Sequence, residues 1–339
     1  MEQLSILLFA MNSIFPVILL VALGYFFKVR GFFTEEFLRI GNKTVFRVLL
    51  PVLLFTNLAD LDSFAELNWD AVLYVLAVVA LLFALGLLFA RSTPDRRQKG
   101  VLLQGVFRSN FALVGVPLAQ LMAGEKGVQA VALLSAFTIP LFNVLSVVAL
   151  TMYVGPEARP GVGGRAGGAL KGILRNPLII GVLAGIGWVL LKPLAGQMPP
   201  VITAFFGKCT FVGTALEYLA RASTPVALLV LGGQFEMDSV RGLRKQITLG
   251  VLGRLLLAPL LGIGGAVLLQ CRGILQFDNG IFAALISLFG TPAAVASAVM
   301  AEEMGNDGQL AGQLVVWTTL LSAGVIFGAV VLVRALGLV

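Results

Sequence analysis

Long apolar runs separated by short polar turns dominate this chain. A membrane-spanning helix needs about 20 predominantly apolar residues, and ten runs approach or exceed that length. We expect them near residues 5–28, 36–58, 69–91, 99–123, 127–154, 173–193, 209–235, 243–270, 277–302 and 308–335. The fourth and ninth are the least uniform, because glycine and proline interrupt them. The pattern predicts an all-α polytopic membrane protein with ten transmembrane helices.

Composition supports lipid as the solvent of this chain and disfavours enzymes. Hydrophobic residues make up 58% of the sequence and charged residues 12%, whereas soluble domains carry roughly 25% charged residues. Histidine is absent, and Cys209 and Cys271 are too few for a disulfide framework. We therefore expect no catalytic residues, no metal site and no cofactor. The first run lacks a basic leader and a cleavage site, so it is predicted to be a transmembrane helix.

The net charge of +7 is explained by loop topology, so we expect no nucleic-acid partner. Fifteen of the 24 lysines and arginines lie in or beside the loops that follow the first, third, fifth and seventh runs, and five lie on the opposite side. The positive-inside rule then places the glycine-rich linker 155–171 in the cytoplasm and both termini outside.

Motifs recur between the two halves of the chain. Arg47-x-x-x-Pro51 recurs as Arg221-x-x-x-Pro225, Gly115-x-Pro117 as Gly290-x-Pro292, Leu145-Ser146 as Leu321-Ser322, and the pair Pro16 and Gly24 as Pro177 and Gly185. The first three offsets are 174 to 176 residues, and the fourth is 161. We infer two five-helix repeats, 1–154 and 172–339, joined by the linker 155–171. Because five is odd, the second repeat is inverted relative to the first, as in many secondary transporters.

The Gly-x-Pro motifs predict where the fourth and ninth helices break and cross. Proline removes a backbone donor and glycine relaxes the chain, so unwinding is expected at Gly115 and Pro117 and at Gly290, Thr291 and Pro292. The half-helix N-termini freed there carry partial positive charge and favour an anionic ligand. The alternative is a pair of simple packing kinks.

Polar residues near the fourth break are candidates for substrate contact. The Asn110 amide could bind a carboxylate or carbonyl, with Arg108 adding charge and Ser109 between them. Alternatively, Asn110 caps a half-helix and Arg108 snorkels to the cytoplasm. Asn143 in the fifth run could face the break or make an interhelical hydrogen bond.

Other charges inside the runs have structural explanations. Glu217 and Arg221 stand four residues apart and can pair on one helix face; Glu217 is alternatively a proton site. Arg47 and Arg254 are expected to be structural and to snorkel.

Several stretches resemble the auxin efflux carrier family over essentially the whole chain. They are Arg108-Ser109-Asn110-Phe-Ala-Leu-Val-Gly115-Val-Pro117, Asn176-Pro177, Arg254-Leu-Leu-Leu-Ala-Pro259, and Thr291-Pro292 through Asn306-Asp307 into Thr318-Thr319-Leu-Leu-Ser322. The family includes bacterial carriers of malonate and malate and plant carriers of indole-3-acetate. The resemblance implies a scaffold of helices 1, 2, 6 and 7, which can form a homodimer, and a transport core of helices 3–5 and 8–10. It also implies Asn110 as the substrate-facing asparagine, with Pro117 and Pro292 at the crossover.

The short linker differs from the long hydrophilic loop of many plant members, which indicates a bacterial-type member of the inner membrane and disfavours auxin. We infer a secondary carrier of small organic anions, with proton or sodium coupling both open. The alternatives are a passive channel, a carrier of a non-anionic solute, an intramembrane enzyme and a sensory module.

Overall fold

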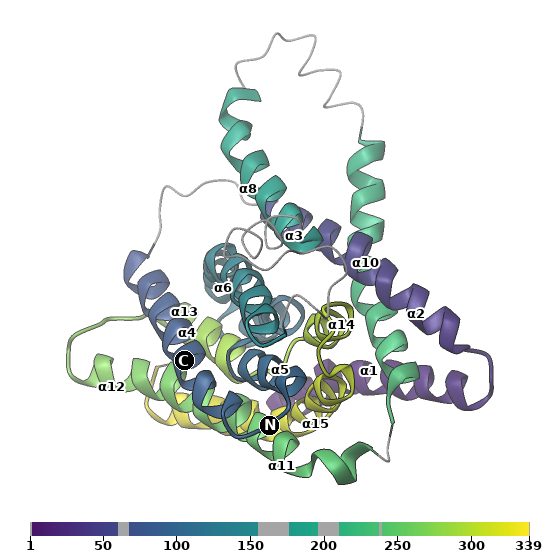
Figure 1. Ribbon diagram of the computed structural model, residues 1–339. Helices are drawn as coiled ribbons and strands as arrows, with labels where there is room; N and C mark the ends of the chain where they lie inside the picture. The colour runs from purple at the N-terminus through teal and green to yellow at the C-terminus, as the bar shows by residue number, and fades with distance from the viewer. Residues whose placement is uncertain (1, 60–67, 155–175, 196–209, 237–238, 339) are drawn as a thin grey trace.

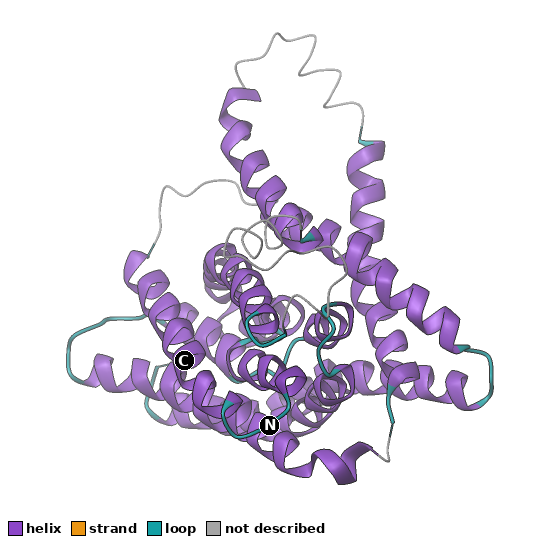
Figure 2. Cartoon of the chain, in the orientation of Figure 1, coloured by secondary structure: helices purple, strands orange, loops and turns teal. Residues whose placement is uncertain are grey.

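The computed structural model describes residues 2–59, 68–154, 176–195, 210–236 and 239–338. These residues are helical almost throughout (Figure 2). The linker 155–171 and Cys209 lie outside the described residues.

Helices cover most of the described part of each of the ten apolar runs (Figure 1), and the runs 99–123 and 277–302 are each interrupted by a short non-helical stretch. The first half contains α1 (Glu2–Val29), α2 (Glu35–Thr44), the π-helical turn η1 (Val45–Leu49), α3 (Leu50–Ala59), α4 (Trp69–Ala90), α5 (Arg96–Phe107) and α6 (Phe111–Thr151). The second half contains α8 (Pro177–Ala195), α10 (Phe211–Gln234), α11 (Ser239–Leu252), η3 (Gly253–Leu257), η4 (Leu260–Gly264), α12 (Gly265–Cys271), α13 (Asn279–Phe289), α14 (Val295–Glu303) and α15 (Gly308–Ala335). α6 is two helices in effect, because Ala123 and Gly124 leave helical geometry.

Length and hydropathy identify five helices of the described residues that could cross a membrane. They are Trp69–Ala90, Val114–Thr151, Phe211–Gln234, Val240–Cys271 and Gly308–Ala335. Phe15–Val29, Pro177–Leu191 and Asn279–Phe289 are shorter apolar helices. Large apolar side chains such as Trp188, Leu190 and Phe211 are exposed, as expected for helices solvated by lipid.

Buried apolar side chains form two clusters. The first joins α4, α6 and α13 and includes Val79, Leu134 and Phe282. The second joins α1, α3, α8 and α10 to α14 and α15 and includes Leu54, Leu228 and Met300. Within it, α1 packs on α10 and α3 packs on α8.

Glycines allow these two helix pairs to approach closely. A Cβ atom on Gly24 of α1 would lie 2.1 Å from the Leu229 carbonyl oxygen of α10. A Cβ atom on Gly185 of α8 would lie 2.8 Å from the Leu58 Cβ of α3. Close helix approach through small residues is typical of helix packing in membranes. Gly24 and Gly185 are the two glycines that the repeated motif pairs, so matched residues perform matched packing roles.

Candidate functional site: the crossing of two helix breaks

Two interruptions of helix meet in the middle of the molecule. The chain leaves helical structure at residues 108–110, between α5 and α6, and at residues 290–294, between α13 and α14. Ser109 and Ala293 form an antiparallel bridge. The Asn110 N–H donates to the Pro292 carbonyl oxygen at 2.8 Å, and the Ala294 N–H donates to the Arg108 carbonyl oxygen at 3.4 Å. Each break thus satisfies backbone groups that the other leaves open, as unwound chain at membrane depth requires.

The position of the first break corrects the sequence prediction. Gly290, Thr291 and Pro292 lie in the second break, but Gly115 and Pro117 lie inside α6. The helix continues past Pro117, and Gly115 instead leaves room for the Phe111 ring, which an added Cβ would meet at 2.8 Å. The chain leaves helical geometry seven residues before Gly115, at Arg108. There its backbone can pair with the backbone of the second break.

Both half-helices that follow the breaks begin without a side-chain cap. Asn110 and Ala294 are the N-cap residues of α6 and α14, and neither side chain accepts a hydrogen bond from the helix. By contrast, Asp278 and Asp307 accept bonds from Ile281 N and Leu310 N and cap α13 and α15. Uncapped first-turn N–H groups point out of the helix and carry partial positive charge. The alternative that the Asn110 side chain caps a half-helix is therefore wrong.

The three residues of the first break differ in their partners. Asn110 is 8% exposed, and Ser109 Oγ is buried without a hydrogen-bond partner. Arg108 is 5% exposed, so it does not snorkel. Its Nη2 donates to Asn143 Oδ1 at 3.0 Å, and its Nη1 contacts Met300 Sδ.

Asn143 is itself fixed, because its Nδ2 donates to the Ile139 carbonyl oxygen at 2.8 Å. Arg108 and Asn143 are therefore in contact, and the guanidinium forms no ion pair with a carboxylate within the part of the chain that the structure describes. A buried charge without a counter-ion raises the local positive potential.

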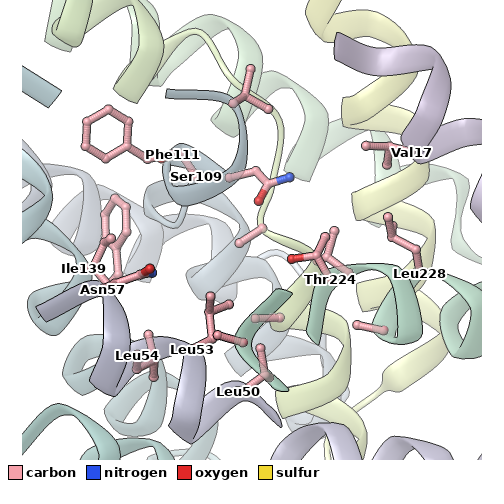
Figure 3. Close-up of a pocket in the computed structure, with 18 of the residues that line it drawn as sticks. Val17, Leu50, Leu53, Leu54, Asn57, Ser109, Phe111, Ile139, Thr224 and Leu228 are labelled. Carbon is pink, nitrogen blue, oxygen red and sulfur yellow. The ribbon is translucent and has the colours of Figure 1, made fainter. Parts of the chain in front are cut away.

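A cavity of about 660 Å³ adjoins the crossing. Arg108, Ser109, Asn110 and Asn143 line it, together with Pro117 and the first residues of α14. Its other walls come from α1, α3, α8 and α10. Figure 3 shows Ser109 and Phe111 on one side of the cavity and Leu50, Leu53 and Asn57 on the other. The cavity therefore lies between the crossing and the helices α1, α3, α8 and α10.

Two polar lining residues escaped the sequence analysis. Asn57 on α3 and Thr224 on α10 both line the cavity (Figure 3). Each is the second residue of a polar pair inside an apolar run, Thr56-Asn57 and Ser223-Thr224, and Thr224 directly precedes the proline of a repeated motif. Those features were available signals, but only the packing shows that both residues face the crossing.

The remaining charged candidates lie in different settings. Glu217 Oε1 and Arg221 Nη2 form an ion pair at 2.5 Å, with side chains 53% and 75% exposed. Arg221 also lines the cavity. Arg47 is exposed, whereas Arg254 is fully buried. The expectation that Arg254 snorkels is therefore wrong: its guanidinium is held by backbone carbonyls instead.

Side-chain hydrogen bonds on one side of the crossing join helices that the cavity separates elsewhere. Asn42 Nδ2 donates to Glu303 Oε1 at 3.1 Å. Gln309 Nε2 and Gln313 Nε2 of α15 donate to the carbonyl oxygens of Gln234 and Glu236, each at 2.9 Å. These bonds tie α2 and the end of α10 to α14 and α15. Within the described residues, no cluster of histidine, cysteine, aspartate or glutamate is arranged to hold a metal ion.

Comparison with known proteins relates the sequence of this chain to transporters. A family model described as "Membrane transport protein" matches residues 9–158 and 167–327. An "Uncharacterized transporter" of Methanothermobacter thermautotrophicus is 26% identical over 92% of this chain and 94% of its own length. A "Putative malonate transporter" of Rhizobium meliloti is 25% identical over 87% of this chain and 86% of its own length.

A plant protein matches a shorter region. Protein PIN-LIKES 2 of Arabidopsis thaliana is 30% identical over 44% of this chain and 32% of its own length. The family model covers most of the chain, and the apolar helices suit a bilayer. The chain therefore belongs to the membrane transport protein family, the auxin efflux carrier family, and is a membrane transporter.

Proposed function

We propose that this transporter is a secondary carrier of small organic anions and that the anion binds where the two helix breaks cross. The observation that carries the proposal is the pair of uncapped helix N-termini, α6 and α14, on one wall of the cavity. Helix N-termini bind carboxylates and phosphates through free N–H groups and the helix dipole. In broken-helix transporters the same ends face anionic substrate groups.

Side chains at the crossing add to this preference for an anion. The Asn110 side chain is not used as a helix cap, so its amide can donate to a carboxylate. Ser109 Oγ, buried and unpartnered, offers a second donor. Arg108 stands behind them with an uncompensated charge. Similarity to a protein whose name includes malonate points in the same direction, so mono- and dicarboxylates are the first substrates to test.

We further propose ten membrane crossings arranged as two inverted repeats, with a scaffold and a moving core. The matched packing of α1 on α10 and of α3 on α8 supports the repeat, because exchanging the two halves interconverts these pairs. The cavity lies between the proposed scaffold (α1, α2, α3, α8 and α10) and the crossing. The positive-inside distribution supports a cytoplasmic linker and external termini.

Alternating access fits the asymmetry of the polar contacts. Bonds such as that from Asn42 to Glu303 join the proposed scaffold to the proposed core on one side of the crossing. Beside the crossing, the cavity leaves the scaffold and the core out of contact. Breaking these contacts while the cavity collapses would expose the site to the other side. A passive channel would instead need a continuous open path past both the crossing and these polar contacts.

The test is charge movement on a solid-supported membrane after the protein is reconstituted into liposomes. Mono- and dicarboxylates are applied to the wild type, to Asn110→Ala and to Asn279→Ala. Asn279 is exposed at the start of α13, so its variant is the matched control.

We expect saturable currents with some acids and a roughly tenfold or larger loss of apparent affinity in Asn110→Ala alone, because a hydrogen bond to a charged group contributes about 1.5–3 kcal/mol. Equal affinity in Asn110→Ala and the wild type would contradict this site. Currents that rise linearly without saturation would favour a channel. Saturable uptake restricted to uncharged radiolabelled solutes would favour a non-anionic substrate.

A further inference from the structure

Arg254 is a buried positive charge that contacts the chain at both helix breaks and is not among the residues that line the cavity. It lies in the π-helical turn η3, between α11 and α12, and has no exposed surface. No carboxylate forms an ion pair with it within the described ranges. An unpaired charge in the interior is costly unless other groups form hydrogen bonds with it. The guanidinium must therefore have other hydrogen-bond partners.

Backbone carbonyl oxygens at two helix ends satisfy the guanidinium. Nη1 donates to the carbonyls of Val106 and Phe107 at 3.4 and 3.2 Å. Nη2 donates to those of Leu288 and Phe289 at 3.0 and 2.7 Å. Nε donates to Thr291 in the second break at 3.0 Å.

Val106 and Phe107 are the last residues of α5, and Leu288 and Phe289 are the last residues of α13. One side chain therefore caps the C-termini of both half-helices that lead into the crossing. The last carbonyls of a helix lack intrahelical partners, and each C-terminus carries roughly half a negative charge. Two of them sum to about one negative charge, which one guanidinium balances.

Such converging carbonyls are a cation site in other carriers. In broken-helix transporters, unwound carbonyls and half-helix C-termini coordinate the coupling cation. Here the same kind of oxygen cage is filled by a side chain of the protein itself.

We propose that Arg254 is a tethered substitute for an inorganic cation: it permanently fills the carbonyl cage at the crossing and makes the assembled core independent of sodium. Removing the guanidinium should therefore create a sodium-responsive protein from an unresponsive one. The inference uses only the geometry of the crossing and is tested without any substrate, so it can hold or fail independently of the anion proposal.

The experiment measures the melting temperature of the purified full-length chain in detergent. Sodium chloride is exchanged for N-methyl-D-glucamine chloride at constant ionic strength. The wild type is expected to melt at the same temperature in both. Arg254→Ala is expected to melt roughly 10 °C lower without sodium, since removing the guanidinium leaves the backbone carbonyls of two helix ends without a partner. Sodium or methylguanidinium, each titrated alone, should restore part of that loss saturably.

Two further variants keep the proposal falsifiable. Arg254→Lys retains the charge with fewer donors, so it should melt between the wild type and Arg254→Ala and should not respond to sodium; it also carries the test if Arg254→Ala does not fold. Arg47→Ala removes an exposed arginine from the π-helical turn η1 and should match the wild type.

Three results would overturn the proposal. The first is a wild type that sodium stabilises. The second is an Arg254→Ala variant that melts like the wild type or that neither cation rescues. The third is an Arg254→Lys variant that gains as much from sodium as Arg254→Ala does.

Discussion

The amide of Asn42 on α2 donates to the carboxylate of Glu303 at the end of α14, across 3.1 Å and 261 positions of sequence. This bond joins the proposed scaffold to the proposed core beside the crossing. In the alternating-access proposal it belongs to one conformation only, so weakening it should favour the other.

The first prediction concerns Asn42→Ala. Losing one hydrogen bond to a carboxylate, about 1.5–3 kcal/mol, should shift the balance between the two conformations roughly tenfold or more. A cysteine introduced as Thr224→Cys, in a background with Cys209 and Cys271 replaced by serine, reports this shift, because Thr224 lines the cavity. Labelling by an impermeant maleimide should fall from the side to which the cavity opens and rise from the other. Unchanged labelling from both sides would show that the bond does not hold the conformation.

The second prediction concerns Asn143 and distinguishes its effect on protein stability from its effect on carboxylate binding. Asn143→Ala removes the acceptor of a buried guanidinium and should cost about 1–3 kcal/mol of stability, whereas Asn143→Asp keeps an acceptor and should melt near the wild type. Because the new carboxylate neutralises Arg108, Asn143→Asp should nevertheless bind carboxylates roughly tenfold more weakly, since a nearby unit charge contributes about 1–2 kcal/mol at an effective dielectric constant of about 20. Melting curves with and without the transported acid measure both effects. Full affinity in Asn143→Asp would mean that Arg108 does not contribute to the anion site.

The third prediction compares two glycines of α10. A Cβ atom on Gly232 would lie 2.0 Å from the Val21 carbonyl oxygen of α1, whereas one on Gly213 would meet nothing within 4 Å. Gly232→Ala should cost about 1–3 kcal/mol or separate the helices. Gly213→Ala should be neutral or stabilising by up to about 1 kcal/mol, because alanine is the better helix former. Fluorescence-detected size exclusion after heating distinguishes them, and equal behaviour would argue against the close approach of α1 and α10.

The fourth prediction assigns Glu217 a local role. Its pair with Arg221 is exposed, and exposed pairs contribute about 0–1 kcal/mol. Glu217→Gln should leave the melting temperature and the pH profile of transport nearly unchanged. A proton site would behave differently, since its removal would abolish or displace the pH dependence of the transport current.

The helices were predictable because they depend on composition over long windows. The described parts of the ten apolar runs are mostly helical, and the residues of the second break were also anticipated. The repeat pairs Gly24 with Gly185, and the structure shows a close-packing role for both that the sequence had not assigned.

Features that depend on distant contacts were not predictable. The first break begins at Arg108 because its backbone can pair with residues 292–294, about 180 positions away. The setting of Arg254 could not be read from its apolar neighbours, since its partners are carbonyls of α5 and α13. Asn57 and Thr224 became candidates only once α3 and α10 were seen around the cavity.

The uncapped N-termini of α6 and α14 have a consequence for how such proteins diverge. Backbone N–H groups persist through almost every substitution, so this part of the proposed anion site is nearly immune to point mutation. The opposite wall of the cavity is made of ordinary side chains such as Leu50, Leu53, Asn57 and Thr224, which mutate freely. If the proposed site is correct, a lineage can retain its preference for anions while its substrates change in shape and size.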